Sequence, residues 1–390
     1  MKSFAIVIVC YNRLSGVKRL LKSLERADYN NRNDITLVFS IDNSGAMEVT
    51  DFANSYEWPY GEKIVRTFPE RQGLKKHILQ CGDFTEKFDI VTILEDDIWV
   101  SDSFYNYAYQ AANFYWDDEN IAGISLYNFQ KNWLDWIYRF EPQKTEFDAY
   151  FLKVAQSWGQ VWTRKKWEPF REWYHNNMEF SYSDEIPNYL LKWPESSWLK
   201  YHDRYCIEQN KYFVYPYVSL STNYSDPGEH ALYAVNDHQV ELQTKKSNYF
   251  FCQFTPESII YDEYMEREGL ERYLGIHNDE LTVSLWGTKS KKIWRRYLLT
   301  TKVLPYKMLD SYALSLRPIE MSIIEGLKGN GIYLYDTYSS DNQSSNNSEY
   351  QLMLYSLRSH DAFRIFGFSL KLFLRETISR VTNKIRKKLK

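Results

Sequence analysis

Residues 90–97 decide the fold: they read Ile90-Val91-Thr92-Ile93-Leu94-Glu95-Asp96-Asp97, an apolar run that ends abruptly in three carboxylates. Unbroken apolar runs of this kind are typical of strands that a parallel sheet buries on both faces. Three acids at such a strand end repel one another and lose solvation unless a positive group binds there. A divalent cation carrying a phosphorylated ligand would supply that charge, because Mg²⁺ and Mn²⁺ prefer hard oxygen ligands. The triplet alone leaves a solvated acidic turn open as the alternative.

Strand and helix patterns alternate around this stretch through the first 130 residues. Apolar, β-branched segments predict strands at 4–10, 35–41, 63–68, 89–94 and 121–126, and helical spacing predicts helices at 15–27 and 74–81. Such alternation implies an α/β fold with a mostly parallel sheet flanked by helices. Ligands of these sheets bind at the carboxyl ends of strands, which is where Tyr11, Asp42 and the acids 95–97 fall.

The rest of the chain is less regular. Residues 131–260 are rich in Trp and Tyr and are predicted to continue the same domain. Helical pieces at 261–273 and 293–304 predict an α-rich extension over 261–338, and the polar tract 339–349 predicts a flexible loop before a C-terminal segment, 350–390. One face of a helix in that segment is formed by Leu370, Leu374, Ile378, Val381, Ile385 and Leu389. From Lys371 onward, eight Lys or Arg stand against the single acid Glu376, so this helix either lies on an anionic membrane surface or docks on its own domain.

Composition narrows the function classes. The 390 residues carry a net charge of −3, which argues against a whole-molecule affinity for nucleic acid. The 17% aromatic content suits cores and also sugar stacking. Four widely spaced cysteines form no CxxC pair, a pattern typical of a reducing cytoplasm and not of a zinc or disulfide framework. The opening apolar run is short and leads into Tyr11-Asn12-Arg13, which favours a strand over a signal peptide, and no run is long enough to span a membrane.

Four segments together resemble the GT-A nucleotide-diphospho-sugar transferases. Residues 5–13 are similar to the opening strand of glycosyltransferase family 2. Glu95-Asp96-Asp97 resembles the DxD-type motif in the form that N-acetylglucosaminyltransferase I and its bacterial relatives use. Residues 157–162 resemble the SWG-x-x-W segment of bacterial members, and 216–224 with Gly228-Glu229-His230 resemble their P-x-x-S-L-x-x-N...G-x-H block. The resemblance covers residues 3–235.

The resemblance implies a GT-A (Rossmann-like) catalytic domain over residues 1–260, with a nucleotide-binding half, 1–130, and an acceptor-binding half, 131–260. It implies a metal-dependent glycosyltransferase, using Mn²⁺ or Mg²⁺, that moves a sugar from a nucleotide-diphosphate donor, a UDP-sugar, to a glycan hydroxyl with inversion. Bacterial surface-polysaccharide assembly, capsule or O-antigen, is the implied setting. A cytoplasmic chain with a basic tail would meet lipid-linked acceptors at the inner face of the cytoplasmic membrane as a peripheral membrane protein.

The same resemblance assigns roles on the donor side. Asp97 and His230 would ligate the metal, Asp96 would lie near the ribose and the metal waters, and Glu95 would orient the sugar. Asp42 would accept a hydrogen bond from uracil N3–H. The groups expected around the base and the phosphates are Tyr11, Arg13, Arg71 and Lys75. Purely structural roles stay open for three of these residues: His230 as an ordinary loop residue, Asp42 as a turn residue and Lys75 as a surface lysine.

The acceptor side is less determined. Inverting transfer needs a carboxylate that takes the proton of the acceptor hydroxyl. The family places an acid directly after a Trp in this region, but here Leu199 follows Trp198. Asp203, one helical turn later, is the predicted base, and an ion pair of Asp203 with Arg204 is the competing interpretation. The other acids considered are Asp184, Glu185, Glu195 and Glu208. Trp158 and Trp162 are predicted as an acceptor platform, or else as a core stripe.

Two other function classes remain. One is a sugar-nucleotide nucleotidyltransferase, which would normally carry a Gly-rich loop with a basic residue after the first strand, and residues 11–15 lack it. The other is a catalytically inactive GT-A module that binds glycan or scaffolds an assembly, and Leu199 is the residue that favours it.

Overall fold

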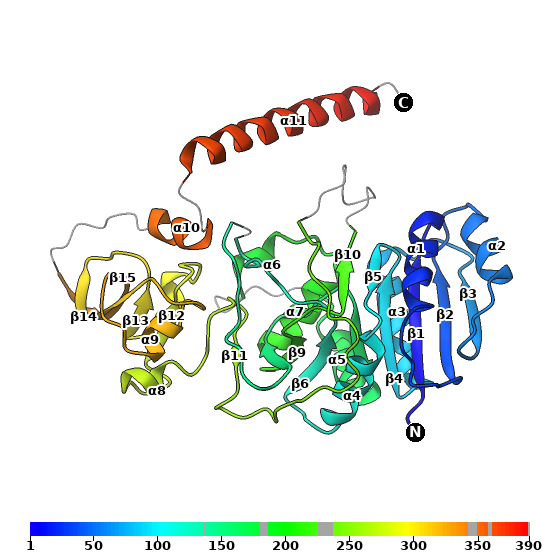
Figure 1. Cartoon of the computed structure of the whole chain (residues 1–390), viewed down its shortest axis with the longest axis horizontal. Coiled ribbons are helices and arrows are strands. Elements are labelled where there is room, and N and C mark those ends of the chain that lie inside the picture. The colour runs from blue at the N-terminus through cyan, green and yellow to red at the C-terminus, as the bar shows by residue number, and fades with distance from the viewer. Residues whose placement is uncertain (136, 180–185, 225–236, 342–348, 358–360, 389–390) are drawn as a thin grey trace.

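A nine-stranded sheet forms the centre of the molecule (Figure 1). The computed structural model describes residues 1–135, 137–179, 186–224, 237–341, 349–357 and 361–388. Across the sheet the strands follow the order β11 (Ile260–Tyr261), β7 (Ala149–Leu152), β9 (Tyr212–Pro216), β6 (Ile121–Ser125), β8 (Gln160–Thr163), β4 (Ile90–Glu95), β1 (Phe4–Cys10), β2 (Ile35–Ile41) and β3 (Lys63–Thr67). β3, β2, β1 and β4 are parallel, as are β6 and β9, whereas β8 pairs antiparallel with β4 and β6. The predicted α/β class with a mostly parallel sheet is confirmed.

Helices cover both faces of this sheet, and its central strands β6, β8 and β1 are buried at every residue. Along β1, Ile6 and Ile8 join one apolar cluster, and Val7 and Val9 join the other. The first cluster takes side chains from α1 (Leu14–Leu24), α2 (Glu48–Ser55) and α4 (Phe104–Phe114). The second takes them from α3 (Leu74–Gly82), α5 (Arg164–Asn176), α6 (Asn188–Lys192) and α7 (Trp198–Glu208). The result is a three-layer arrangement with two separate cores.

The region after residue 261 is a second sheet, so the predicted α-rich extension over 261–338 is wrong. Its strands follow the order β12 (Leu281–Ser284), β13 (Tyr297–Thr300), β15 (Gly331–Ser340) and β14 (Tyr306–Ala313). The predicted helix at 293–304 contains β13, and the one at 261–273 contains the end of β11 and the start of the short α8 (Glu271–Leu274). Short apolar runs fit both helical and strand periods, and the Ile and Tyr residues of β15 favour a strand.

Three further helices complete this part of the chain: α9 (Met321–Ile324), α10 (Glu349–Leu357) and α11 (Ala362–Lys388). The last two lie in the predicted C-terminal segment, where a helix was expected. Figure 1 shows α11 standing apart from the rest of the protein, with α10 beside the second sheet. Most of the predicted polar loop, residues 342–348, lies outside the described residues.

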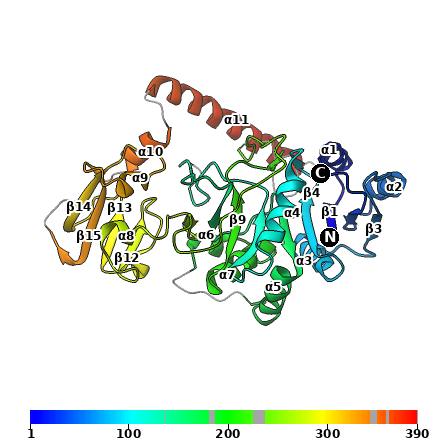
Figure 2. The same cartoon turned by 60° about the horizontal axis from the view of Figure 1, so that its bottom comes forward.

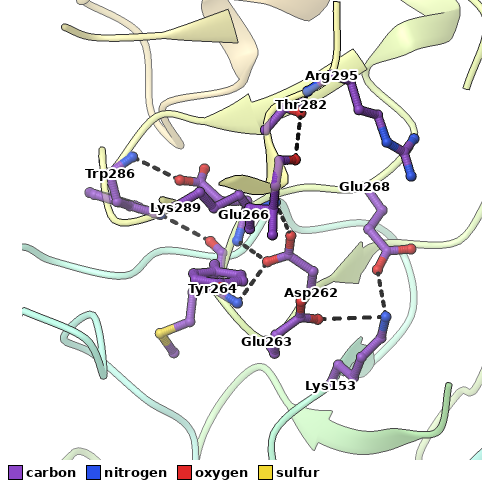
Figure 3. A network of polar contacts seen from close by, with 12 residues as sticks. Lys153, Asp262, Glu263, Tyr264, Glu266, Glu268, Thr282, Trp286, Lys289 and Arg295 are labelled. Atoms are coloured by element: carbon purple, nitrogen blue, oxygen red, sulfur yellow. Dashed lines mark hydrogen bonds and ion pairs between the residues drawn. The ribbon is translucent and has the colours of Figure 1, made fainter. Parts of the chain in front are cut away.

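A buried network of charges joins the two sheets (Figure 3). Lys153, at the end of β7, lies 3.6 Å from Glu263 and 3.7 Å from Glu268. Asp262 accepts hydrogen bonds from the backbone N–H of Tyr264 and of Glu266 and pairs with Lys289. The Glu266 carboxylate in turn accepts the N–H of Trp286 at 2.9 Å. The acids of residues 262–268 therefore pair with Lys153 from the first sheet and with Lys289, which follows β12 of the second.

Candidate functional site

The acid triplet lies at the carboxyl edge of the parallel strands. β4 ends at Glu95, which pairs with Val9 of β1, and Asp96 and Asp97 form the turn into β5 (Ile98–Val100). β1 and β2 end at the same edge, the upper end of the strands in Figure 1. Tyr11 and Asp42 follow these two strands directly, so the sheet brings them to the same edge as the triplet, as the strand order predicts.

Arg13 neutralises part of the triplet. It caps the start of α1, and its Nε donates to the Asp96 carboxylate at 3.3 Å while Nη2 contacts the other Asp96 oxygen. The same nitrogen lies 3.4 Å from Asp97 Oδ2. Burial alone would lower the pKa of Arg13, but the two carboxylates raise it above its usual value. Arg13 was expected beside the base and phosphates, and in this structure its guanidinium holds the acids.

Close backbone packing fixes the turn that carries these acids. A Cβ added at Gly16 would lie 2.6 Å from the backbone oxygen of Asp96, so only glycine lets the first turn of α1 approach so closely. This contact and the Arg13 pair fix α1 against the turn. The position of the acids is therefore set by the protein itself.

Glu95 and the Oδ1 atom of Asp97 lie outside the direct contacts of Arg13. Burial, and then the charges of Asp97 and Asp96, raise the pKa of Glu95 to about 8. Asp97 Oδ1 is buried and has no hydrogen-bond partner among the described residues. Such an oxygen is costly to bury unless a cation or a donor meets it, so this atom fits a divalent metal ligand.

The rest of a metal site is not assembled from the described residues. No three His, Cys, Asp or Glu side chains within them are placed to hold an ion together. His230, the predicted second ligand, lies outside the described residues. The fit to a cation therefore rests on Asp97 Oδ1, with the oxygens of a bound phosphate as the further ligands that such a site would use.

Asp42 organises the loop that precedes α3. Its carboxylate accepts the backbone N–H groups of Asn43 at 2.8 Å, Gln72 at 2.7 Å and Gly73 at 3.0 Å. The side chain is 5% exposed, so these bonds are made in a largely water-free position. Asp42 thus holds the start of α3 at the sheet edge, which is the turn role that the sequence left open for it.

Arg71 and Lys75, the two predicted phosphate contacts, point to different places. The Arg71 guanidinium lies over the Tyr11 ring, 5.1 Å from its centre, at the same edge as the triplet. Lys75 Nζ donates to the backbone oxygen of Glu195 at 2.7 Å and lies over the ring of Tyr201. Lys75 therefore joins α3 to the segment before α7, and the structure does not bring it to the acids.

A two-stranded ribbon lies between the triplet and a cavity with both aromatic and polar lining residues. β10 (Ser221–Asn223) pairs antiparallel with β5, and the Tyr224 N–H donates to the backbone oxygen of Asp97 at 2.8 Å. On the far side of β10, the Val240 N–H donates to the Thr222 hydroxyl. The cavity, of about 170 Å³, is lined by Tyr127, Phe129, Gln130, Lys131, Asp237, Gln239 and Val240. It lies one strand away from the acids.

Trp158 lies beside this cavity. Its ring is partly exposed and packs 4.7 Å from the ring of Tyr127 and 4.3 Å from that of His238. Burial lowers the pKa of His238, while the charges of Asp237 and Asp97 oppose that shift. The sequence did not single out His238. The predicted histidine was His230, eight positions earlier, in the Gly228-Glu229-His230 block.

Two predicted acceptor-side residues are core residues. Trp162 is 0% exposed and packs against Trp167 with ring centres 4.2 Å apart, so it offers no face to a sugar. Asp203 is also 0% exposed, and burial raises its pKa well above the usual value. Its Oδ1 accepts the Ala155 N–H at 2.6 Å. The prediction of Asp203 as the base is therefore wrong for this structure, because no acceptor hydroxyl can reach it.

Asp203 instead supports the loop that carries Trp158. Ala155 is followed by Gln156, whose side-chain oxygen accepts the N–H groups of Ser157 and Trp158. Of the alternative acids, Glu208 pairs with Arg204 on α7, Glu195 lies before α7, and Asp184 and Glu185 lie outside the described residues.

Comparisons with known proteins give only remote likenesses. No family model and no curated protein sequence matches the chain. Among solved structures, the chain is similar to the mannosyltransferase PcManGT from Pyrobaculum calidifontis in complex with GDP-Man and Mn²⁺, at 13% identity and a TM-score of 0.33, over 56% of this chain and 58% of that one. GalNAc-T7 with UDP, GalNAc and Mn²⁺ gives 13% identity and a TM-score of 0.37, over 55% and 43%. S. aureus TarS 1-349 in complex with UDP gives 16% and 0.34, over 55% and 60%. In each case less than two thirds of the other protein is matched, and likenesses this remote carry no argument about function.

Proposed function

We propose that this protein is a metal-dependent glycosyltransferase that moves a sugar from a nucleotide-diphosphate donor, a UDP-sugar, to a glycan hydroxyl. The observation that carries the proposal is the unpartnered Asp97 Oδ1 in an acid triplet at the carboxyl edge of parallel strands. Buried carboxylate oxygens at that edge suit a cation with a phosphorylated ligand, because parallel α/β sheets bind their ligands there.

The residues around Asp97 would each contact a different part of the donor. Asp97 would hold the divalent metal, and a bound cation would neutralise the charge that develops on the departing diphosphate. Arg13 keeps Asp96 in place beside it. Tyr11, with Arg71 over its ring, offers a flat face for a base at the neighbouring strand end. Glu95, half-buried at the end of β4, would orient the sugar.

The cavity beyond β10 is the proposed acceptor site, with Trp158 as its platform. Pyranose rings pack their apolar faces on aromatic side chains, and Trp158 presents a partly exposed ring at this place. Lys131 and Asp237, 3.3 Å apart, supply polar groups at the rim. With Asp203 buried, Asp237 is the acid that lines the cavity among the described residues, and we assign it as the base of an inverting transfer.

A thermal-shift panel tests the donor assignment. UDP, GDP, CMP and dTDP are each added with and without Mn²⁺, and UDP with Mn²⁺ should raise the melting temperature. A ligand at a hundred times its Kd adds about 2.7 kcal/mol. Asp97→Asn should remove the metal-dependent part, and Asp117→Asn, at an exposed surface acid, is the matched control. If no nucleotide shifts the folded protein with metal, the proposed function is refuted.

A second candidate is a GT-A-like module that binds a ligand without catalysis. Arg13 favours it, because a guanidinium already supplies part of the charge that the acids need. This candidate predicts a nucleotide shift that does not depend on metal, together with no release of sugar from the UDP-sugar donor. Donor turnover that falls in Asp237→Asn would exclude it.

We place the reaction in bacterial surface-polysaccharide biosynthesis, in capsule or O-antigen assembly, on a free or lipid-linked glycan. A cytoplasmic enzyme at the inner membrane face would meet such acceptors through peripheral contact of its basic C-terminal helix. Within the described residues, no helix is both long and apolar enough to cross a bilayer.

A further inference from the structure

The C-terminal helix α11 is the longest helix among the described residues. It runs through 27 residues, Ala362–Lys388, which makes it about 40 Å long. Figure 1 shows it separated from both sheets, whereas in Figure 2, turned by 60°, its C-terminal end overlaps the first sheet in projection. A helix of this kind normally gains most of its stability from burying an apolar face against the protein.

The first half of α11 exposes an unusual number of large apolar side chains. Their exposed fractions range from 45% to 92%, and the residues are Phe363, Phe366, Phe368, Leu370, Leu372, Phe373, Leu374 and Ile378. Phe363, Phe366, Leu370, Phe373 and Leu374 recur at spacings of three and four, so they share one side of the helix. Contiguous apolar surface of this kind marks a site of interaction with a protein or a membrane.

Basic residues accompany this face. Arg364, Lys371 and Arg375 fall on the flank next to the apolar side when the sequence is wound at helical spacing. Further along, the sequence adds Arg380, Lys384, Arg386, Lys387, Lys388 and Lys390, and Glu376 is the one acid from Lys371 onward. The charge that would complement this helix is negative and continuous along its length.

We propose that α11 binds the surface of an anionic membrane, lying in the plane of the interface. The phenylalanine face would enter the boundary between headgroups and acyl chains, and the flanking Lys and Arg would meet the lipid phosphates. Pairing with a second copy of α11 is disfavoured, because two such helices bring like charges together and offer each other almost no acids.

Vesicle flotation of the full-length protein tests this. It should bind vesicles that contain phosphatidylglycerol, bind pure phosphatidylcholine vesicles far less, and lose affinity at high salt. Phe366→Ser/Phe373→Ser should weaken binding about a hundredfold through lost apolar burial. Serine has nearly the helix propensity of phenylalanine, so these substitutions should leave the helix formed. Lys371→Gln/Arg375→Gln should weaken binding about 25-fold, roughly fivefold for each charge.

Matched controls separate this helix from the rest of the surface. Leu309→Ser/Tyr338→Ser removes two exposed apolar side chains from the second sheet, and Lys22→Gln/Arg26→Gln removes two exposed charges near α1. Both should bind vesicles as the unchanged protein does. All variants should keep the same melting temperature, because the changed side chains lie outside the two cores.

Three results would overturn the proposal: no vesicle binding, equal binding to neutral and anionic vesicles, or equal loss in the control variants. Sedimentation velocity without lipid supplies a fourth. If the protein self-associates and Phe366→Ser/Phe373→Ser makes it monomeric without altering vesicle binding, the face is an interface between copies. The nucleotide panel measures a different property, so failure here leaves the proposed reaction standing, and the reverse also holds.

Discussion

Replacing Arg13 with glutamine should destabilise the protein in a way that a divalent cation reverses. Arg13 contacts both Asp96 and Asp97, and its removal leaves three acids at one strand end without their guanidinium. Removing one partner of a buried ion pair costs about 3–5 kcal/mol. The Arg13 side chain is 27% exposed, so solvent screens part of this and about 2 kcal/mol remains.

This loss converts into a measurable melting shift. A chain of 390 residues unfolds with an entropy of about 0.8 kcal/mol per kelvin, so 2 kcal/mol lowers the melting temperature by about 2–3 °C. Mn²⁺ bound at Asp97 Oδ1 would replace the lost charge. At a hundred times its Kd the ion returns about 2.7 kcal/mol, which is enough to cancel the loss.

Thermal unfolding with and without Mn²⁺, in the absence of nucleotide, measures both effects. Arg13→Gln should gain more from Mn²⁺ than the unchanged protein, and Arg13→Gln/Asp97→Asn should gain nothing. Arg26→Gln, at an exposed arginine just after α1, controls for the loss of one charge. The reasoning is refuted if Arg13→Gln is no less stable than Arg26→Gln, or if the double variant still responds to the ion.

Three further predictions concern other contacts. Burial raises the pKa of Glu266 to about 8, so folding takes up a proton between pH 5 and 8 and stability falls as pH rises, by up to about 1.4 kcal/mol per pH unit. In melting curves across this range, Glu266→Gln should flatten that fall and Glu325→Gln, at an exposed acid, should not. Gly16→Ala should cost about 1–3 kcal/mol in denaturant titrations, because its Cβ meets the Asp96 oxygen at 2.6 Å, and stabilisation would contradict the close approach. Asp203→Ala should lose about 1–3 kcal/mol by leaving the Ala155 N–H unpaired, whereas Asp203→Asn keeps the acceptor and most of the stability. A large loss of donor turnover in Asp203→Asn at normal stability would restore it as the base.

The strands that sequence predicted best are those buried on both faces. β1 and β2 match their predicted bounds, 4–10 and 35–41, because every residue in them is buried and the apolar run has no competing pattern. α2 was not predicted, since only Val49 and Ala53 of its eight residues are buried and the rest is polar. β13 was assigned to a helix because four apolar and β-branched residues define no period.

The candidate site also has a part that the sequence predicts and a part that it does not. The meeting of Tyr11, Asp42 and Glu95–Asp97 at one edge follows from the order of parallel strands, which the alternation of strands and helices implies. The pairing of Arg13 with Asp96 and the burial of Asp203 depend instead on how α1 and α7 pack against loops far away in the chain. No pattern within a short window contains that information.

The charge network between the sheets also bears on the order in which parts of the protein can fold during translation. Lys153 is translated long before Glu263 and Glu268, its two counter-charges, and β11 closes the sheet edge beside β7 only when residues 260–261 exist. The half of the sheet built from β1 to β4 can form as it leaves the ribosome. The free edge of β7 keeps unpaired backbone N–H and C=O groups until β11 has been synthesised. Premature termination just before residue 260 would therefore yield a chain with an unsatisfied lysine and a bare strand, a species prone to aggregate.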